Sequence, residues 1–317
     1  MINLSLKDKK ILSVIEVDGH LAYSEIAKKI GLSKQIVKYR MDLLEKENII
    51  QEYYAVVNDS RLGREVYFVY IQLNSLTNED EKSLIHSLKK NPNILSYFSS
   101  MGNWDFVLAL HAKNHNELNK NLKSCLGPIN NKIRNRVISS IEGGEYLSSK
   151  IFSSMGRKNI SAVSGSQEKI DKLDLDLINE LMGNGRATLV ELATKFHMSA
   201  NGIRERVKSL EKKEVIYGYK TKINYEKLGF LHVHFFVWAK SFDSEFYKKL
   251  KSFLIQDGKT EFIAKSFGYA DVEFRCNLES IGELYELKRK IKNHFKENIN
   301  SIESLIVVRS GLSHLKK

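Results

Sequence analysis

The sequence predicts an α+β protein in which two small helical domains and two βαββαβ domains form an internal pseudo-dimer. Three observations predict this fold. The same motifs occur twice at constant spacing, the first half of each copy has the apolar period of short helices, and the second half alternates strands with helices.

The repeat has one constant offset over most of each copy. Gly185 follows Gly19 by 185 − 19 = 166 positions, and the same offset relates Asp271 to Asp105. A constant offset means that neither copy carries an insertion or deletion across this stretch. Self-similarity of this kind indicates a duplicated structural unit.

The composition is that of a globular protein with excess positive charge. The 317 residues are 42% hydrophobic and 28% charged, and the formal net charge is +12. This excess favours a polyanionic partner, with nucleic acid ahead of a membrane surface. Cys125 and Cys276 lie far apart, which disfavours a disulfide framework or zinc ribbon. Without a signal peptide or an apolar run of membrane-spanning length, we expect a cytoplasmic protein with no membrane partner.

Residues 7–47 predict three short helices. The first runs over 7–17, and the second begins at Ser24 as its N-cap and ends at Gly31, whose freedom to adopt positive φ permits a tight turn. Ser33 caps the third helix. Three helices joined in this way form a helix-turn-helix. The apolar segment 49–58 that follows predicts a β-wing.

The second copy repeats this plan with two changes. His197 stands at the turn glycine, and histidine tolerates the left-handed region better than most residues. Glu214 stands where the first copy has Asn48. Because glutamate is a poorer helix stop, we expect a local difference there.

The N-terminal side of the third helix is the surface that enters the major groove. Gln and Asn there can pair with adenine, and Lys and Arg can reach guanine or phosphate. A merely solvated basic face is the alternative, but two matched copies in a basic chain favour DNA. The candidate contacts are Ser33, Lys34, Gln35, Lys38, Tyr39 and Arg40 in the first copy, and Ser199, Asn201, Arg204, Arg206 and Lys208 in the second. Since the two faces differ, we expect the halves to prefer different bases.

The second half of each copy predicts a ferredoxin-like βαββαβ domain. In the first copy the expected elements are a strand over 66–73, a helix over 79–90, strands over 94–100 and 104–111, a helix over 117–125 and a strand over 134–141. The first strand is apolar on both faces, and two helices can cover only one face of the sheet. We therefore expect the sheets of the two copies to pack face to face.

His232 and His234 lie on one face of the matched strand in the second copy. No carboxylate or cysteine stands at fixed spacing from them, and the companion residues in the first copy are Val66 and Phe68. We therefore expect interface packing rather than a metal site, and we predict no metal and no cofactor.

The chain divides into five predicted segments. The stretch between the copies is rich in serine and glycine and has little periodicity, which predicts a flexible linker. The segments are winged helix-turn-helix domains over 1–61 and 169–227, ferredoxin-like domains over 62–147 and 228–317, and the linker over 148–168.

Together these motifs resemble the Lrp/AsnC, or feast/famine, family of transcription regulators. Asp18–Gly19 and the helix-turn-helix pattern around Gly31 and Arg40 carry part of the resemblance. The turns Gly102–Asp105 and Gly268–Asp271 look like the Gly-x-x-Asp turn of that family's small-molecule-binding (RAM) domain. Family members usually carry one unit per chain, whereas this chain carries two.

The resemblance implies binding to double-stranded DNA, self-association into higher assemblies, and an amino acid or related metabolite as effector. The effector candidates carried over by position are Gly102, Asn103, Asp105, Gly268, Tyr269 and Asp271, with Met101 beside them. The alternative for each is structural, since glycine can make the hairpin and aspartate can cap it.

Two other functions fit parts of the pattern. Siroheme-decarboxylase enzymes of the haem pathway are similar to Lrp/AsnC proteins and also pair two units. Their chemistry would call for His and Arg near the second and third strands, but the segment 97–104 has neither, and the second copy offers Lys265 alone. A sensor that has lost DNA binding is the other alternative. We expect a regulator that is not an enzyme.

Overall fold

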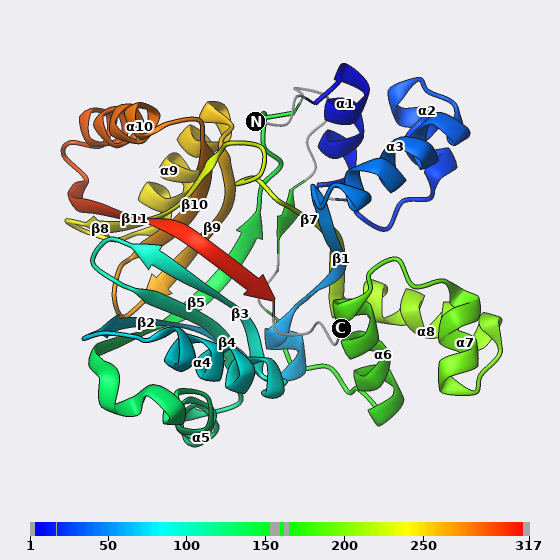
Figure 1. Cartoon of the computed structure of the whole chain (residues 1–317), viewed down its shortest axis with the longest axis horizontal. Helices are drawn as coiled ribbons and strands as arrows, with labels where there is room; N and C mark the ends of the chain where they lie inside the picture. The colour runs from blue at the N-terminus through cyan, green and yellow to red at the C-terminus, as the bar shows by residue number, and fades with distance from the viewer. Residues whose placement is uncertain (1–3, 17, 153–158, 162–164, 313–317) are drawn as a thin grey trace. The chain divides into compact units, whose positions relative to one another are not determined.

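The computed structural model describes residues 4–16, 18–152, 159–161 and 165–312. The chain forms two compact units (Figure 1). The helical unit comprises Met1–Leu62, Glu145–Phe230 and Phe253–Glu261, and the barrel unit comprises Gly63–Gly144, Leu231–Ser252 and Phe262–Lys317. Each unit contains parts of both copies, so the pseudo-dimer exists within each unit.

The helical unit contains both predicted helix-turn-helix domains. The first copy supplies α1 (Leu6–Ile15), α2 (Tyr23–Ile30), α3 (Lys34–Lys46) and β1 (Ile50–Val57); the second supplies α6 (Lys172–Gly183), α7 (Leu189–Phe196), α8 (Ala200–Lys212) and β7 (Ile216–Ile223). The predicted start of α2 is wrong by two residues. Ala22, not Ser24, is the N-cap, and its N–H donates to the Glu25 carboxylate at 2.8 Å. Glu25 thus satisfies the N–H of the N-cap residue, while its own N–H donates to the Ala22 carbonyl at 3.0 Å, since alanine has no side-chain acceptor.

The turn residues behave as predicted at two positions and differently at a third. Gly31 and His197 both adopt left-handed φ, at 69° and 53°. The expected difference at Glu214 is wrong, because its φ of 55° matches the 53° of Asn48. Arg61 lies 3.0 Å from the Glu214 carboxylate. This ion pair helps to stabilise Glu214 in the left-handed region, which glutamate adopts only rarely.

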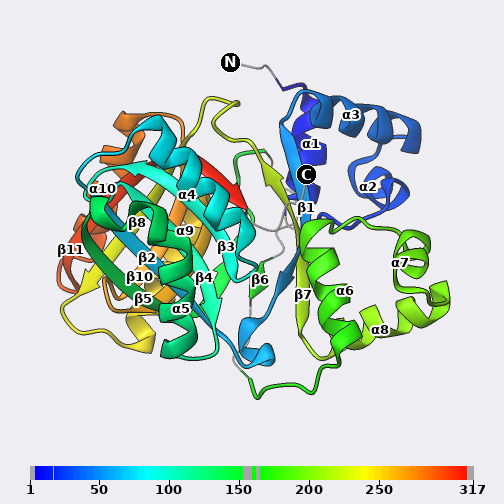
Figure 2. The same cartoon turned by 60° about the horizontal axis from the view of Figure 1, so that its bottom comes forward.

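The two helix-turn-helix domains are joined through one strand from each copy. The segment predicted as a β-wing does form a strand, β1, but among the described residues its partner is β7 of the other copy rather than a strand of its own domain. The two strands run side by side (Figure 2), and the pairing is antiparallel. Its register places Tyr54 opposite Lys220. A lone strand needs a partner for its backbone groups, and each copy supplies the other's.

Two glycines allow the domains to approach these strands closely. The N–H of Gly19 donates to the Tyr219 carbonyl at 3.0 Å, and the N–H of Gly185 donates to the Tyr53 carbonyl at 2.7 Å. A Cβ on Gly185 would lie 2.7 Å from the backbone N of Tyr54, and one on Gly19 would lie equally close to β7 backbone, at 2.8 Å. Gly19 and Gly185, which correspond by the repeat offset, are therefore also the points at which each copy contacts the strand of the other.

The barrel unit confirms the βαββαβ order in both copies. The first copy forms β2 (Glu65–Leu73), α4 (Asn78–Lys90), β3 (Ile94–Met101), β4 (Phe106–Ala112), α5 (His115–Leu126) and β5 (Ile133–Tyr146). The second forms β8 (Leu231–Ala239), α9 (Ser244–Asp257), β9 (Thr260–Phe267), β10 (Val272–Leu278), α10 (Ile281–His294) and β11 (Ile299–Leu312). Short 3₁₀ helices cover Asp59–Leu62 and Gly127–Lys132, and β6 (Ile160–Ser161) pairs with the end of β5.

The eight long strands close into a ring. Their order is β2-β4-β3-β11-β8-β10-β9-β5, and β5 also pairs with β2. The predicted burial of one sheet by the other is confirmed on β2, where Phe68 and Tyr70 make ring contacts with Phe262 and Phe236 of the second copy. The last strand of each copy also joins the other copy's sheet, which removes exposed strand edges.

The predicted linker is not uniformly loose. Phe152 is 7% exposed and belongs to the core of the first helix-turn-helix domain, and Ile160 is 2% exposed. Residues 153–158 and 162–164, which the prediction also included, lie outside the described residues. Because the segment is rich in serine, its composition did not indicate that Phe152 and Ile160 are buried. Among the described residues, no helix has the length and apolar character to cross a membrane.

Glu16 is a buried carboxyl at the junction of both copies and the predicted linker. It accepts hydrogen bonds from the Tyr225 hydroxyl at 2.6 Å and from the Ser149 hydroxyl at 3.2 Å. Burial raises the pKa of Glu16, and the Lys220 charge and these hydrogen bonds oppose the rise only in part. The folded chain therefore holds this proton more tightly than the unfolded chain does.

We expect Glu16→Gln to flatten the pH dependence of stability. A raised pKa in the folded state gives stability that is present below the unfolded value, near 4.5, and is lost as the pH rises through the folded value. Glutamine keeps an acceptor and cannot ionise, so the variant should gain thermal stability relative to the parent at about pH 7.5. Thermal unfolding from about pH 5 to 8 measures this, and parallel profiles for the two proteins would contradict it.

Candidate nucleic-acid interface and effector turns

The two recognition helices, α3 and α8, are anchored alike. Ser33 and Ser199 cap them, each hydroxyl accepting a backbone N–H of the first turn at 3.3 and 3.0 Å. One face of each helix is buried, through Val37 in α3 and Ile203 in α8. An amphipathic helix held in this way presents its other face to solvent.

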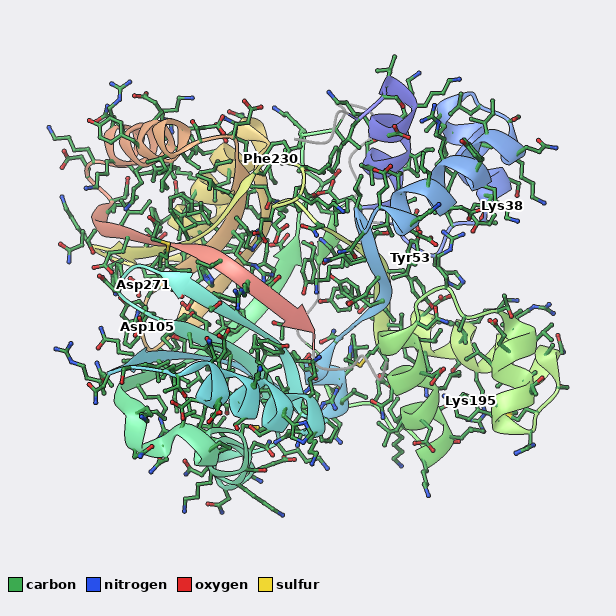
Figure 3. The ribbon with its side chains drawn as sticks, viewed as in Figure 1. Lys38, Tyr53, Asp105, Lys195, Phe230 and Asp271 are labelled. Atoms are coloured by element: carbon green, nitrogen blue, oxygen red, sulfur yellow. The ribbon has the colours of Figure 1, made fainter. Side chains whose placement is uncertain are left out.

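The predicted reading residues lie on the exposed faces. In α3 these are Lys34, Gln35, Lys38 and Tyr39, and in α8 they are Asn201, Arg204 and Lys208. Tyr39 is 66% exposed, so its ring is accessible on this face. Figure 3 places Lys38 on α3. In α8, Arg204 donates to the Asn201 amide oxygen at 3.0 Å, which orders two neighbouring side chains that can both reach bases.

Arg40 and Arg206 do not join this surface. Arg206 lies 2.7 Å from the carboxylates of both Asp171 and Asp174, and Arg40 lies 3.6 Å from that of Asp8. These ion pairs tie each recognition helix to the first helix of its own domain and raise the pKa of Arg206. We assign both arginines a structural role in place of the predicted DNA contact. The signal was present in the sequence, because Asp174 follows Asp8 by the repeat offset of 174 − 8 = 166.

A pair of side chains that the sequence reasoning missed joins the two domains beside the close glycines. His20 stacks on Tyr219 at 4.5 Å between ring centroids, and its Nδ1 lies 2.5 Å from the Gly185 carbonyl. Arg186, at the matched position, donates to the Gly19 carbonyl at 3.2 Å. Each loop is therefore fixed by the polar side chain of the other.

The aspartates of the two predicted effector turns act structurally. The Asp105 carboxylate accepts the backbone N–H of Leu73 at 2.7 Å, and that of Asp271 accepts the N–H of Ala239 at 2.8 Å. Both aspartates are labelled in Figure 3. These bonds pin each turn to the first strand of its own copy, which supports the structural alternative for these two residues.

The glycines of the same turns face the other copy. Gly102 and Gly268 have φ of 147° and 137°, which favours glycine. A Cβ on Gly102 would lie 3.1 Å from the Cβ of Leu305 in β11, and one on Gly268 would collide with the Ile138 carbonyl in β5. Each turn therefore sits against a strand of the opposite copy.

Glu303 brings candidates from both turns together. The Asn103 amide donates to its carboxylate at 2.7 Å, and the Tyr269 hydroxyl donates at 3.0 Å. Strand pairing places Glu303 opposite Phe236 and Val137 opposite Tyr70, so Val137 is the counterpart of Glu303 in the first copy. The two turns are thus chemically unequal. Sequence reasoning missed Glu303 because it lies beyond the point where the constant offset fails.

His234 lies inside the barrel, as expected for interface packing. It is fully buried, stacks on Phe236 at 4.8 Å and lies 3.0 Å from Glu273 through Nε2. The Tyr70 hydroxyl donates to the same carboxylate. Burial lowers the pKa of His234, and Glu273 opposes that shift. Glu273 was missed because it reaches His234 from the neighbouring strand, β10. Among the described residues, no group of three or more His, Cys, Asp or Glu is placed to hold a metal.

Comparison with known proteins matches these domains. A family model described as winged helix-turn-helix DNA-binding matches residues 4–51 and 170–217. HTH-type transcriptional regulator FL11 of Pyrococcus furiosus is 31% identical over 123 residues, which are 38% of this chain and 79% of FL11. HTH-type transcriptional regulator LrpC of Bacillus subtilis is 29% identical over 143 residues, which are 45% of this chain and 98% of LrpC.

Solved structures of one protein cover both copies at once. The siroheme decarboxylase NirDL superposes with a TM-score of 0.62 over 95% of this chain and 90% of its own, at 10% sequence identity. That likeness concerns the fold alone. The sequence relatives instead match about one copy each, at higher identity and over most of their own length. This chain belongs to the Lrp/AsnC family of HTH-type transcriptional regulators and carries the family's unit twice.

Proposed function

We propose that this chain is a sequence-specific DNA-binding transcription regulator of the Lrp/AsnC type, in which two unlike recognition helices read one DNA site. The observation that carries the proposal is the pairing of β1 with β7, which holds two exposed basic helices in one compact unit. A helix-turn-helix dimer reads two half-sites in this manner, and here the dimer is a single chain. The second contact is then intramolecular and independent of dimerisation.

The proposed DNA contacts are the exposed members of the predicted set. They are Ser33, Lys34, Gln35, Lys38, Tyr39, Ser199, Asn201, Arg204 and Lys208. Gln35 and Asn201 have the donor and acceptor pair that suits adenine, and the cations suit guanine or phosphate. Because Lys34 and Gln35 correspond to Ala200 and Asn201, the two half-sites differ and the operator is asymmetric.

An electrophoretic mobility shift with genomic promoter fragments tests DNA binding. The proposal expects specific binding that weakens steeply as salt rises, since neutralised phosphates release counterions. A chain that acts only as a sensor through protein contacts would bind no DNA at low salt.

An amino acid or a related metabolite is the proposed effector, at the Gly-x-x-Asp turns of the barrel unit. Asn103, Tyr269 and Glu303 support this, because the carboxylate and the two polar groups suit an ammonium and a carboxylate of one ligand. Gly102 and Gly268 would let the ligand approach backbone, and Asp105 and Asp271 would position the turns. Self-association beyond the internal pseudo-dimer and residence in the cytoplasm belong to the same proposal.

The enzymatic alternative has one observation in its favour, the likeness of fold to siroheme decarboxylase over nearly the whole chain. Against it, His234 is 0% exposed among aromatic rings and is already paired with Glu273. Incubation with an iron tetrapyrrole separates the two functions. The regulator is expected to leave the Soret band unchanged, and a saturable Soret shift would favour the enzyme.

A further inference from the structure

A cleft of about 360 Å³ lies within the helical unit, between the helix-turn-helix domain of the first copy and that of the second. The first copy contributes His20 and Lys34 to its wall, and the second contributes Arg186 together with apolar side chains. Of the residues that line the cleft, the proposed function uses Lys34 alone, as a DNA contact. The cleft also belongs to a different unit from the effector turns.

The sequence explains why the cleft extends into the second copy. Ala187 stands at the position of Leu21, since 187 − 21 = 166, and Val207 stands at the position of Met41 by the same offset. In the first copy Met41 is fully buried and fills its domain core. The smaller residues leave apolar space beside Leu192, which also lines the cleft. The second copy therefore presents smaller apolar side chains to the cleft than the first copy carries at the matching positions.

The rim of the cleft is cationic and partly preorganised. Arg186 is held by the Gly19 carbonyl at 3.2 Å and lies 4.8 Å over the ring of Tyr23. A guanidinium has five N–H donors, and the contacts among the described residues use one of them. Lys34, the first residue of α3, is exposed and also lines the cleft. Among the described residues, no acidic side chain lines the cleft.

We propose that this cleft binds a small organic acid, with its carboxylate on Arg186 and Lys34 and its apolar body against Ala187, Leu192 and Val207. Arginine recognises a carboxylate through two parallel N–H···O bonds, which fixes its orientation as well as its charge. An apolar interior with a few convergent polar groups is the usual composition of a small-molecule site. The volume suits an acid of about ten non-hydrogen atoms.

Such a ligand would weaken DNA binding, a consequence that rests on the proposed function. It would occupy Lys34, which is also a proposed DNA contact on α3. It would also bridge the first copy to the second and restrict the spacing of the two recognition helices. A ligand shifts an equilibrium only through its different affinity for the two states, and the free and DNA-bound chains differ at Lys34.

Isothermal titration of the full-length chain with phenylacetate tests the site directly and without DNA. Phenylacetamide has the same shape without the charge and serves as the matched ligand. We expect saturable binding of about one phenylacetate per chain and at least about tenfold weaker binding of the amide, because the carboxylate contacts are charge-assisted.

Two variants locate the site. Ala187→Leu restores the side chain that the first copy carries and should abolish phenylacetate binding by filling the cleft. Lys34→Gln should weaken binding severalfold through loss of charge, whereas Lys195→Gln, on α7 outside the cleft wall, should leave it unchanged. Lys34 lies on the surface, so its variant remains informative if Ala187→Leu fails to fold.

Three results would overturn the proposal: no saturable binding up to about 10 mM phenylacetate, equal affinity for the amide, or unchanged affinity in Ala187→Leu and Lys34→Gln alike. Failure of the proposed function is a separate outcome, seen as absent DNA binding in the mobility-shift experiment while phenylacetate still binds.

Discussion

Gly185→Ala is expected to destabilise the helical unit and weaken DNA binding, although alanine is the smallest possible side chain. Its Cβ would lie 2.7 Å from the N and 2.9 Å from the Cα of Tyr54, and these are backbone atoms of β1 that cannot rotate away. The domain must move back from β1, which strains the 2.7 Å hydrogen bond from the Gly185 N–H to the Tyr53 carbonyl. Overpacking of this kind costs about 1–3 kcal/mol.

The matched control is Gly282→Ala, in α10. The atom that a Cβ at Gly282 would meet is the Ser280 Oγ, at an ordinary contact distance of 3.5 Å, and a helical backbone is acceptable for alanine. The same substitution there should be neutral or stabilising, by about 0.4–1 kcal/mol. Scanning calorimetry of both variants, which resolves units that unfold separately, measures the difference. Equal melting of Gly185→Ala and the parent would show that the copies do not pack this closely.

Lys38→Ala and Arg204→Ala are expected to weaken specific DNA binding by about 1–3 kcal/mol each, or roughly five- to 150-fold. Both side chains are exposed on the outer face of a recognition helix, so their removal leaves the cores of the domains intact. Titration of labelled DNA at several salt concentrations measures the loss. A residue that contacts phosphate also reduces the salt slope by about one.

Lys89→Ala and Arg134→Ala are the controls, since each removes the same charge from an exposed position in the barrel unit. They should change affinity little, because neither residue lies on a recognition helix and the loss of one net charge contributes weakly in physiological salt. Unchanged affinity in both Lys38→Ala and Arg204→Ala would contradict the proposal that α3 and α8 contact the DNA. A loss equal to that of the controls would reduce the effect to net charge.

The sequence predicts most of the fold because local patterns determine its elements. The helical period and the capping serines Ser33 and Ser199 predicted the helix-turn-helix domains. The strand at 66–73, which is apolar on both faces, predicted that one sheet buries the other. The exchange of strands between copies was not predictable. Pairing of β1 with β7 and of β11 with β3 joins residues far apart in the chain, and no local pattern specifies a long-range partner.

The site was predicted less completely, for a related reason. Helix position alone placed Lys38 and Arg204 on exposed faces, but it could not show that Arg206 is occupied by Asp171 and Asp174. Glu303 reaches the effector turns from a strand that follows a break in the repeat. The repeat offset therefore predicts which residues of the two copies correspond. Tertiary contacts decide which of those residues are free to contact DNA or a ligand.

Selection of bound sequences from a random DNA library with the full-length chain tests the central claim most directly. We expect one enriched site with two unlike half-sites, separated by about one helical turn or a multiple of it. Lys38→Ala should relax the base preference in one half-site, and Arg204→Ala should relax it in the other. A perfect palindrome, or no enriched sequence, would contradict the claim that two unlike recognition helices read a single site.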